Sequence, residues 1–568
     1  MKNTLSTAIT AFLLVSCTND SGYSARTVQT KQVNNPGSGD INEVGAQNQT
    51  ENTIEEISQE VKESAPEITA SPARLRLLNG QELQETYFKV TGLKMASDFE
   101  NADMTSGYDT GANGLVGDAL FLKVLQNLED LAKQYVEENS KTEFPCLLNP
   151  DEACIQKFIK ELGIKAFRRE LTQTETDEIA TDYTKQKAIE GATEQEALTF
   201  LTIRILGSAN TLYRNELSNS LEGNDKAQFI SYSLTGLPPD SELLDTAKKG
   251  ELVDVGLSSQ LDRLLLSSEF KSRLTAFIRQ WLDLNDLLRM EKNPENFPKF
   301  ENAELPKALR AEFDSYVEDV FFTKQGNLKS LLSSDTTFIN QHTAPLYSVT
   351  ANGDNLQSHK MNPQRRKGIL TLASTMSVHG IEDQTDIDKP VDKAVMISER
   401  MLCRVVGLPS GIDIGMALDN VKENINDFEN LTTRKKMEAA MQQDQSCIAC
   451  HEQFMPYGYM LSHYGSLGQY METFNSSPLD ASVEKAFLDG GVKPYDSILK
   501  FIDDLENSQQ IQNCFAKNLA QFFSGNFEGE HVKSFEEYFI HFLKADNSLI
   551  ATIKSLYMEE NFYKRIAK

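Results

Sequence analysis

The chain has 568 residues, enough for several domains, and 40% of them are hydrophobic, enough to build real cores. It carries 83 acidic and 56 basic residues, a formal net charge of −27. Such a surface repels nucleic acid and anionic lipid headgroups, so the composition argues against a DNA or RNA partner. The charge favours solubility, and a basic partner would fit it better than an acidic one.

The first residues have the pattern of an export signal. Lys2 supplies a short positive region, and residues 5–15 form an apolar run too short to span a membrane. The run leads into LVSC at 14–17, which resembles the lipobox of bacterial lipoproteins. The resemblance implies cleavage before Cys17 and lipidation of that cysteine; the alternative is an ordinary signal peptide with a chance cysteine. Thr18, rather than Asp, follows and by the same resemblance favours the outer membrane.

The next segment, to about residue 70, is rich in small polar residues and poor in aromatic ones. It cannot bury enough surface to offset the entropy cost of ordering, so we expect a flexible tether. With lipid chains on Cys17, such a tether would hold the protein on a membrane without a spanning helix. No later stretch is long and apolar enough to span a bilayer.

From residue 72 onward the pattern is mostly helical. Residues 74–93 have helical spacing after a cap at Asn79, and residues 259–290 form the apolar stripe of one or two amphipathic helices. Trp281, the single Trp, lies on that stripe and is expected in the core. Helical patterns also cover 305–333 and 535–568, and alternating strand patterns are few. The fold class is therefore mainly α.

Pro, Gly and Asn clusters divide the chain into six parts. The expected order is a signal peptide (1–16), the tether (17–70), an N-terminal helical domain (71–220), a central helical domain (221–350), a domain with the chemical motif described next (351–475) and a C-terminal helical domain (476–568).

The motif that carries chemistry is CIACH at 447–451. In CxxCH each thiol can add across one haem vinyl group, and the following histidine projects towards the iron. Cys447 and Cys450 would therefore attach one haem c covalently, and His451 would be its proximal ligand. Attachment follows export, which the N-terminal pattern provides. The sequence thus predicts a multi-domain helical body with a cytochrome-c-like segment in its C-terminal third.

Two other interpretations of the motif stay open. Structural zinc needs four ligands, and His463 is the only further candidate nearby. A redox dithiol of the thioredoxin type would open a helix within an α/β domain, whereas strand patterns are lacking around it.

The sixth ligand of the proposed iron is not fixed by the motif. Met455 is only four residues from His451 and is expected to pack, while Met460, His463 and Met471 follow within one loop or helix. His379 lies far upstream. Met471 is our preferred distal candidate; a methionine there would favour a higher potential than a second histidine, and an empty position would permit ligand binding.

The remaining cysteines support this assignment. Of the seven in the chain, Cys17 is assigned to lipid and two to the motif, which leaves an even number in an oxidising compartment. Cys146 and Cys154 are close enough to pair across a short loop, and Cys403 would then pair with Cys514. Other connectivities stay open, because four cysteines allow three.

Several separated motifs resemble the planctomycete-type surface cytochromes, a family built from domains of unknown function around one CxxCH. The motifs are spread over about residues 72–568. They are the helix from Arg74 to Thr86, AFRRELT at 166–172, LGS at 206–208 with LYRNE at 212–216, PDSELL at 239–244, QWL at 280–282, RKGILT at 366–371, the CxxCH stretch at 447–468 and the closing stretch at 556–565.

The chain also departs from the family pattern. The Asp-Pro after CxxCH is Met455-Pro456, and the Ser-Pro-Val-x-Arg-Gly pattern is reduced to KPVDKA at 389–394. The Arg of the family's RLSYFLW motif is absent at 228–232, which reads QFISY. The resemblance supports haem and fold more than activity, because the role of the family is poorly defined.

The favoured hypothesis is a lipid-anchored cytochrome that transfers electrons at the cell envelope to a redox partner not identified by the sequence. The alternatives are a haem-dependent peroxidase or oxidase acting on surface or extracellular substrates, and a scaffold lipoprotein whose CxxCH holds no haem. Whether the protein is an enzyme stays open, because no P-loop, nucleophile elbow or HExxH motif is present.

Overall fold

The computed structural model describes residues 56–95, 107–110, 118–288, 304–379, 390–406, 451–474, 476–527 and 529–566, with residues 54, 290 and several positions between 432 and 448. Helices predominate throughout these ranges, and every strand belongs to a two-stranded sheet. The predicted fold class, mainly α, is confirmed. No helix in these ranges is both long and apolar enough to cross a bilayer.

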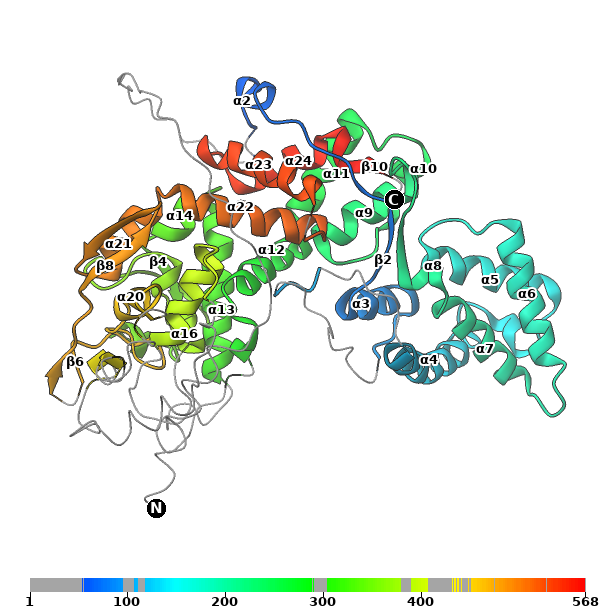
Figure 1. Ribbon diagram of the computed structural model, residues 1–568. Coiled ribbons are helices and arrows are strands. Elements are labelled where there is room, and N and C mark those ends of the chain that lie inside the picture. Colours follow the sequence, from blue (N-terminus) through cyan, green and yellow to red (C-terminus); the bar gives the residue numbers. More distant parts are fainter. Residues whose placement is uncertain are drawn as a thin grey trace, which may run out of the picture.

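The N-terminal lobe, residues 77–212, has a hydrophobic core of its own. It forms the right-hand part of Figure 1. Its helices begin at side-chain caps: Asn79, Thr172 and Thr193 each form a complete capping box with a glutamate three residues on. They are α3 (Gly80–Thr91), α4 (Asp118–Asn139), α5 (Glu152–Phe167), α6 (Gln173–Lys187), α7 (Glu194–Leu206) and α8 (Ala209–Leu212), with a 3₁₀ turn at Pro145–Leu148.

The remaining helices form the main body around one contiguous core, which also takes in residues from both ends of the described chain. Trp281 is fully buried in it, as predicted. These helices are α2 (Gln59–Glu63), α9 (Gly223–Thr235), α10 (Ser241–Lys248), α11 (Asp254–Leu265), α12 (Ser268–Trp281), α13 (Glu304–Glu318), α14 (Leu328–Ser333), α15 (Ala373–Val378), α16 (Pro390–Val395), α20 (Met455–Tyr459), α21 (Ile498–Leu505), α22 (Gln509–Ser524), α23 (Glu530–Lys544) and α24 (Leu549–Met558).

The strands join segments that are distant in the sequence as well as local hairpins. The distant pairs are β1 (Ser71–Pro72) with β10 (Arg565–Ile566), in parallel, and β2 (Arg74–Leu77) with β3 (Tyr213–Glu216), antiparallel. The others, all antiparallel, are β4 (Thr336–Ile339) with β5 (Gln357–Lys360), β6 (Thr473–Phe474) with β7 (Ser477–Pro478), and β8 (Val483–Leu488) with β9 (Gly491–Tyr495).

Two local expectations need correction. The helix expected over 74–93 begins only after Asn79, and the residues before it are β2, because their backbone pairs with β3. The expected tether also ends earlier than residue 70. Ile57 and Ile68 are buried in the main body, and His541 on α23 has its Nε2 2.8 Å from the Val61 carbonyl oxygen. Two isoleucines in a polar stretch are enough to dock it on the helices.

Both expected disulfides are present. Cys146 and Cys154 close a short loop inside the N-terminal lobe, whereas Cys403 and Cys514 connect segments 111 residues apart in the main body. Disulfides persist in oxidising compartments, so the pair of them indicates an exported, non-cytosolic protein.

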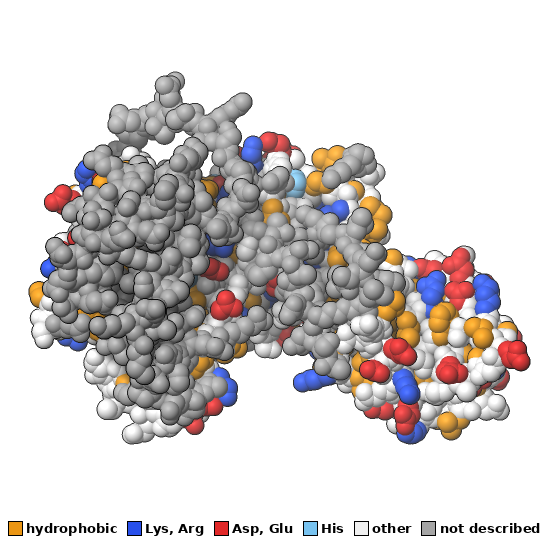
Figure 2. All heavy atoms as spheres, turned by 60° about the horizontal axis from the view of Figure 1, so that its bottom comes forward, with side chains coloured by type: hydrophobic (Ala, Val, Ile, Leu, Met, Phe, Trp, Pro, Cys, Tyr) orange, Lys and Arg blue, Asp and Glu red, His pale blue; other side chains and the backbone are white. Residues whose placement is uncertain are grey.

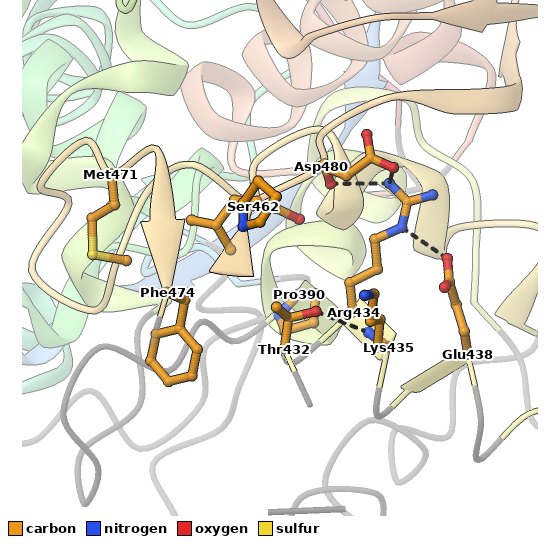
Figure 3. A pocket seen from close by; sticks show the side chains of 11 residues that line it. Pro390, Thr432, Arg434, Lys435, Glu438, Ser462, Met471, Phe474 and Asp480 are labelled. Atoms are coloured by element: carbon orange, nitrogen blue, oxygen red, sulfur yellow. Dashed lines mark hydrogen bonds and ion pairs between the residues drawn. The ribbon is translucent and has the colours of Figure 1, made fainter. Parts of the chain in front are cut away.

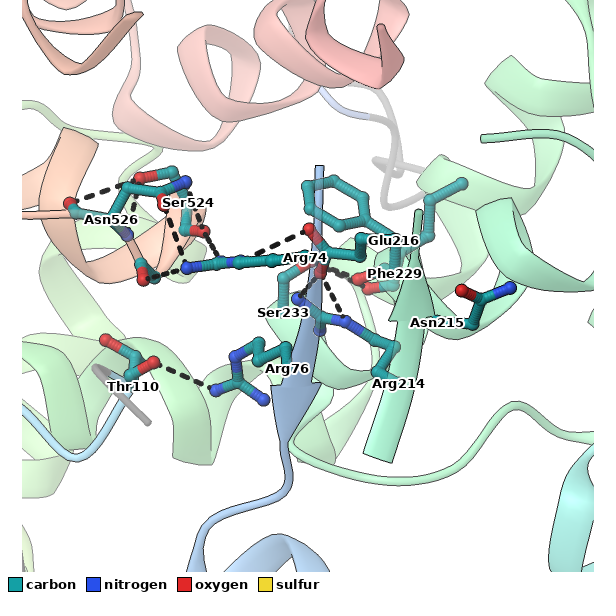
Figure 4. A network of polar contacts seen from close by, with 12 residues as sticks. Arg74, Arg76, Thr110, Arg214, Asn215, Glu216, Phe229, Ser233, Ser524 and Asn526 are labelled. Atoms are coloured by element: carbon teal, nitrogen blue, oxygen red, sulfur yellow. Dashed lines mark hydrogen bonds and ion pairs between the residues drawn. The ribbon is translucent and has the colours of Figure 1, made fainter. Parts of the chain in front are cut away.

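A buried ionic cluster lies where β2 and β3 join the lobe to the main body (Figure 4). Glu216 on β3 accepts hydrogen bonds from Arg214, at 2.8 and 2.5 Å, and from Arg565, at 3.2 and 3.3 Å. The Arg74 guanidinium lies 3.5 Å from the same carboxylate and donates to the Ser524 carbonyl at the end of α22. The cluster thus connects the beginning, middle and end of the described chain.

The surface carries mixed charge. On the face shown in Figure 2, acidic and basic side chains are interspersed over the N-terminal lobe at the right. Exposed ion pairs in the lobe, such as Lys141 with Glu137 at 2.9 Å, contribute little stability.

Candidate functional site

His451 lies at the start of a compact helical turn that leads into α20. Its carbonyl accepts a hydrogen bond from the Phe454 amide at 3.3 Å, and the neighbouring Glu452 amide donates to the Ile448 carbonyl at 2.9 Å. Cys447 and Cys450 lie outside the described residues. Their role in haem attachment therefore stays a prediction, as does that of Cys17, which also lies outside them.

The His451 side chain is mostly buried beside Phe454, with 5.2 Å between the ring centroids. Burial lowers the pKa of its imidazole below the ordinary value, which keeps the ring neutral, the form that binds metals. Its Nδ1 atom is buried and has no hydrogen-bond partner among the described residues. A buried polar atom without a partner is uncommon and marks a position where a group is missing or a function is carried.

Met471, the preferred distal candidate, lines a pocket beside the β6–β7 hairpin (Figure 3). Its sulfur lies 3.9 Å from Gln469 Nε2. Arg434, on the opposite side of the pocket, pairs with Glu438 and Asp480. His451 is not among the residues that line this pocket, and the assignment of Met471 as the distal ligand stays a prediction.

The other distal candidates have partners of their own. Met455 and Met460 are each 1% exposed and pack in the main core, as expected for Met455. His463 Nδ1 lies 2.8 Å from the Met471 carbonyl oxygen, and His379 Nε2 lies 3.3 Å from the Leu282 carbonyl oxygen. Among the described residues, no group of three or more His, Cys, Asp or Glu is arranged to hold a metal ion.

The segment that follows His451 is held by α16. Lys393 on α16 is fully buried and donates from Nζ to the Tyr464 carbonyl at 2.7 Å. Gly458 on α20 lies so close to α16 that an added Cβ would be 1.9 Å from the Pro390 carbonyl oxygen. The KPVDKA motif departs from the family pattern, but its Lys393 is a buried cation bonded to the Tyr464 carbonyl.

Arg366, in the RKGILT motif, fixes the far end of the same segment. Its guanidinium donates to the Leu346 carbonyl at 2.8 Å and to the Gly468 carbonyl at 2.5 Å. It also stacks over the ring of Tyr347, 4.3 Å from the centroid. Gly468 has φ of +75°, and a Cβ there would lie 2.6 Å from the backbone of Ala373, so glycine is required.

Glu312 on α13 is a buried, hydrogen-bonded carboxylate that the sequence pattern does not single out as a candidate site residue. It is fully buried and accepts hydrogen bonds from Tyr347, from Thr337 Oγ1 at 3.1 Å and from the Ser374 amide at 2.9 Å. Burial raises the pKa of its carboxyl, and the bonds from Tyr347 and Ser374 oppose that rise. A glutamate on an amphipathic helix gives no sequence signal of such partners, because they come from segments far along the chain.

Two parts of the chain match models of known protein families. Residues 221–349 match PSD4, a protein of unknown function (DUF1592), and residues 366–473 match PSCyt3, a protein of unknown function (DUF1588). No curated protein and no solved structure matches the chain. Arg366 and Glu312 thus both bond across the boundary between the two matched ranges.

Both matched families are planctomycete cytochrome c-type domains, so the resemblance drawn from the separated motifs is confirmed. Residues 221–349 and 366–473 are therefore similar to two planctomycete cytochrome c-type domain families, PSD4 and PSCyt3.

Proposed function

We propose that this protein is an exported lipoprotein that carries one haem c and transfers electrons at the cell envelope. The haem would be held by Cys447 and Cys450, with His451 as the axial ligand, and Cys17 would carry the lipid. The observation that supports the proposal most strongly is the state of the other cysteines. Both remaining pairs form disulfides, so apart from Cys17 the CxxCH thiols are the only ones without another assigned role.

The surroundings of His451 fit a haem. Burial lowers the pKa of the imidazole and so favours its neutral form, the form that binds iron, and the ring lies against the apolar ring of Phe454. The PSCyt3 match covers the motif, and its family name points to the same cofactor. When bound, the haem would supply a one-electron redox couple whose potential depends on the axial ligands and on burial. The chain's own part is to hold the imidazole and exclude water.

The test is a haem-stained denaturing gel of the mature protein made with a cytochrome c maturation system. We expect a stained band and a reduced-minus-oxidised spectrum with a c-type α band. Replacing both Cys447 and Cys450 with Ala should abolish the stain, whereas replacing both Cys146 and Cys154 with Ala should leave it. A colourless wild-type protein with two free thiols would refute the proposal.

The same material separates electron transfer from haem catalysis. A closed site with two protein ligands should not bind cyanide or imidazole readily, whereas a peroxidase or oxidase needs an open position. Tight cyanide binding by the oxidised wild-type protein would therefore favour the enzyme over the electron carrier.

A further inference from the structure

Helix α16 lies in direct backbone contact with α20. At Gly458 the two backbones are very close: an added Cβ would lie 1.9 Å from the Pro390 carbonyl oxygen and 3.1 Å from Ala394 Cβ. The nearer atom is backbone and cannot move aside as a flexible side chain could. Any residue larger than glycine would therefore force the two helices apart.

Lys393 reinforces that contact with a buried charge. Its side chain is fully buried, and its ammonium donates to the Tyr464 carbonyl at 2.7 Å. Tyr464 is five residues beyond the end of α20, and its own hydroxyl donates to the Arg365 carbonyl. Burying an ammonium is costly unless its hydrogen bonds are made, so a cation retained here fixes the geometry of whatever it bonds.

Backbone hydrogen bonds at both ends of α20 and one ring contact lie between this anchor and His451. The Tyr464 amide donates to Leu461 and the Leu461 amide donates to Gly458, each at 3.0 Å. At the other end of α20 the Tyr457 amide donates to the Phe454 carbonyl at 3.0 Å, and Phe454 packs on the His451 ring. The segment around α20 is thus a short, hydrogen-bonded unit with the imidazole at its start and the Lys393 contact at its end.

We infer that Lys393 is a positioning residue for the axial histidine: by bonding the Tyr464 carbonyl and keeping α16 on Gly458, it sets the orientation of the His451 imidazole. The inference rests on the proposed haem site. Mutating a residue that orients a metal ligand without itself binding the metal typically lowers metal affinity or activity by about 10–100-fold. An arginine at position 393 could make the same bond, because a guanidinium is also a charged N–H donor.

The test compares three variants of the full mature chain: Lys393→Met, Lys393→Arg and, as a control, Lys485→Met, which removes an exposed lysine from β8. All three should stain for haem, because attachment is through the cysteines. We expect Lys393→Met to bind added imidazole roughly tenfold more tightly than wild type, because the probe competes with a loosened His451. Its Soret band and midpoint potential should shift as well. Lys393→Arg should restore wild-type values, and Lys485→Met should match wild type throughout.

Several outcomes would overturn the inference while leaving the proposed function intact. One is a stained Lys393→Met protein with wild-type spectrum, potential and imidazole affinity. Another is a Lys393→Arg protein as altered as Lys393→Met.

If Lys393→Met does not accumulate, Lys393→Gln keeps a hydrogen-bond donor without the charge and takes its place in the comparison. Gly458→Ala, which separates the same two helices from the other side, should reproduce the spectral shift; a wild-type spectrum would contradict the inference. Absence of stain in wild type, by contrast, would remove the proposed function itself.

Discussion

The N-terminal lobe and the main body are stabilised in different ways. In the lobe the disulfide and the helix caps are local: the disulfide joins residues 8 apart, and the capping boxes each span three residues. In the main body the decisive contacts are distant. Its disulfide joins residues 111 apart, β1 pairs with β10, and Arg565 bonds Glu216 across 349 positions.

The difference shows which parts of the fold depend on the whole chain. Local contacts cost little loop entropy, so the disulfide loop and the capped helix starts of the lobe can form from neighbouring residues. Distant contacts must overcome the closure of long loops, and the main body is complete only once both ends of the described chain have met. Each of the following changes should therefore affect one region more than the other.

The two disulfides should give the largest contrast. Replacing Cys403 and Cys514 with Ser should cost about 4–5 kcal/mol in the free energy of unfolding of the main body, because the disulfide closes a long loop. Replacing Cys146 and Cys154 with Ser should cost less than about 3 kcal/mol and affect the lobe alone. Hydrogen exchange followed by region would report both effects, and equal losses spread over the whole chain would contradict the division.

The ionic cluster comes next. Glu216→Gln leaves Arg74, Arg214 and Arg565 buried around a neutral amide, which should cost about 3 kcal/mol or more. The matched change in the lobe is Glu175→Gln. The Arg169 guanidinium beside it, with the Thr172 amide, lowers the pKa of the Glu175 carboxyl to about 2, but the group is partly exposed, so we expect about 1 kcal/mol, as for a lost cap. Urea unfolding of both variants measures the contrast, and a Glu216 variant as stable as wild type would refute it.

The smallest expected effect is on pH dependence. Burial, with the charges of Arg74 and Arg565, lowers the pKa of His531 to about 4. The unfolded chain takes up this proton near pH 6.5, so the stabilisation is complete above that pH and is lost as the pH falls towards about 4. The melting temperature of the main body should therefore fall between pH 7 and pH 5. The variant His531→Phe should show a smaller fall over the same pH range.

The lobe provides the internal control for this titration, because residues 77–212 contain no histidine. Its stability should change little over the same range. A lobe that loses stability as steeply as the main body would show that other groups dominate.

Structural features that depend only on short stretches of sequence could be predicted from the sequence. The cap at Asn79, the burial of Trp281, the short disulfide and the CxxCH motif depend on residue type and near spacing. The strand at 74–77 and the docking of Ile57 could not, since each is decided by a partner far along the chain. The same holds for Glu312, whose donors come from three other segments.

By itself the sequence determined the helical class, the presence of a CxxCH segment that predicts haem attachment, and the family resemblance, because periodicity and motif spacing are local properties. Only the tertiary structure decided that α16 holds α20, that a buried lysine bonds the Tyr464 carbonyl, and that three arginines from distant segments share Glu216. The physical reason is that buried charges need partners, and which partners they find depends on how the whole chain closes.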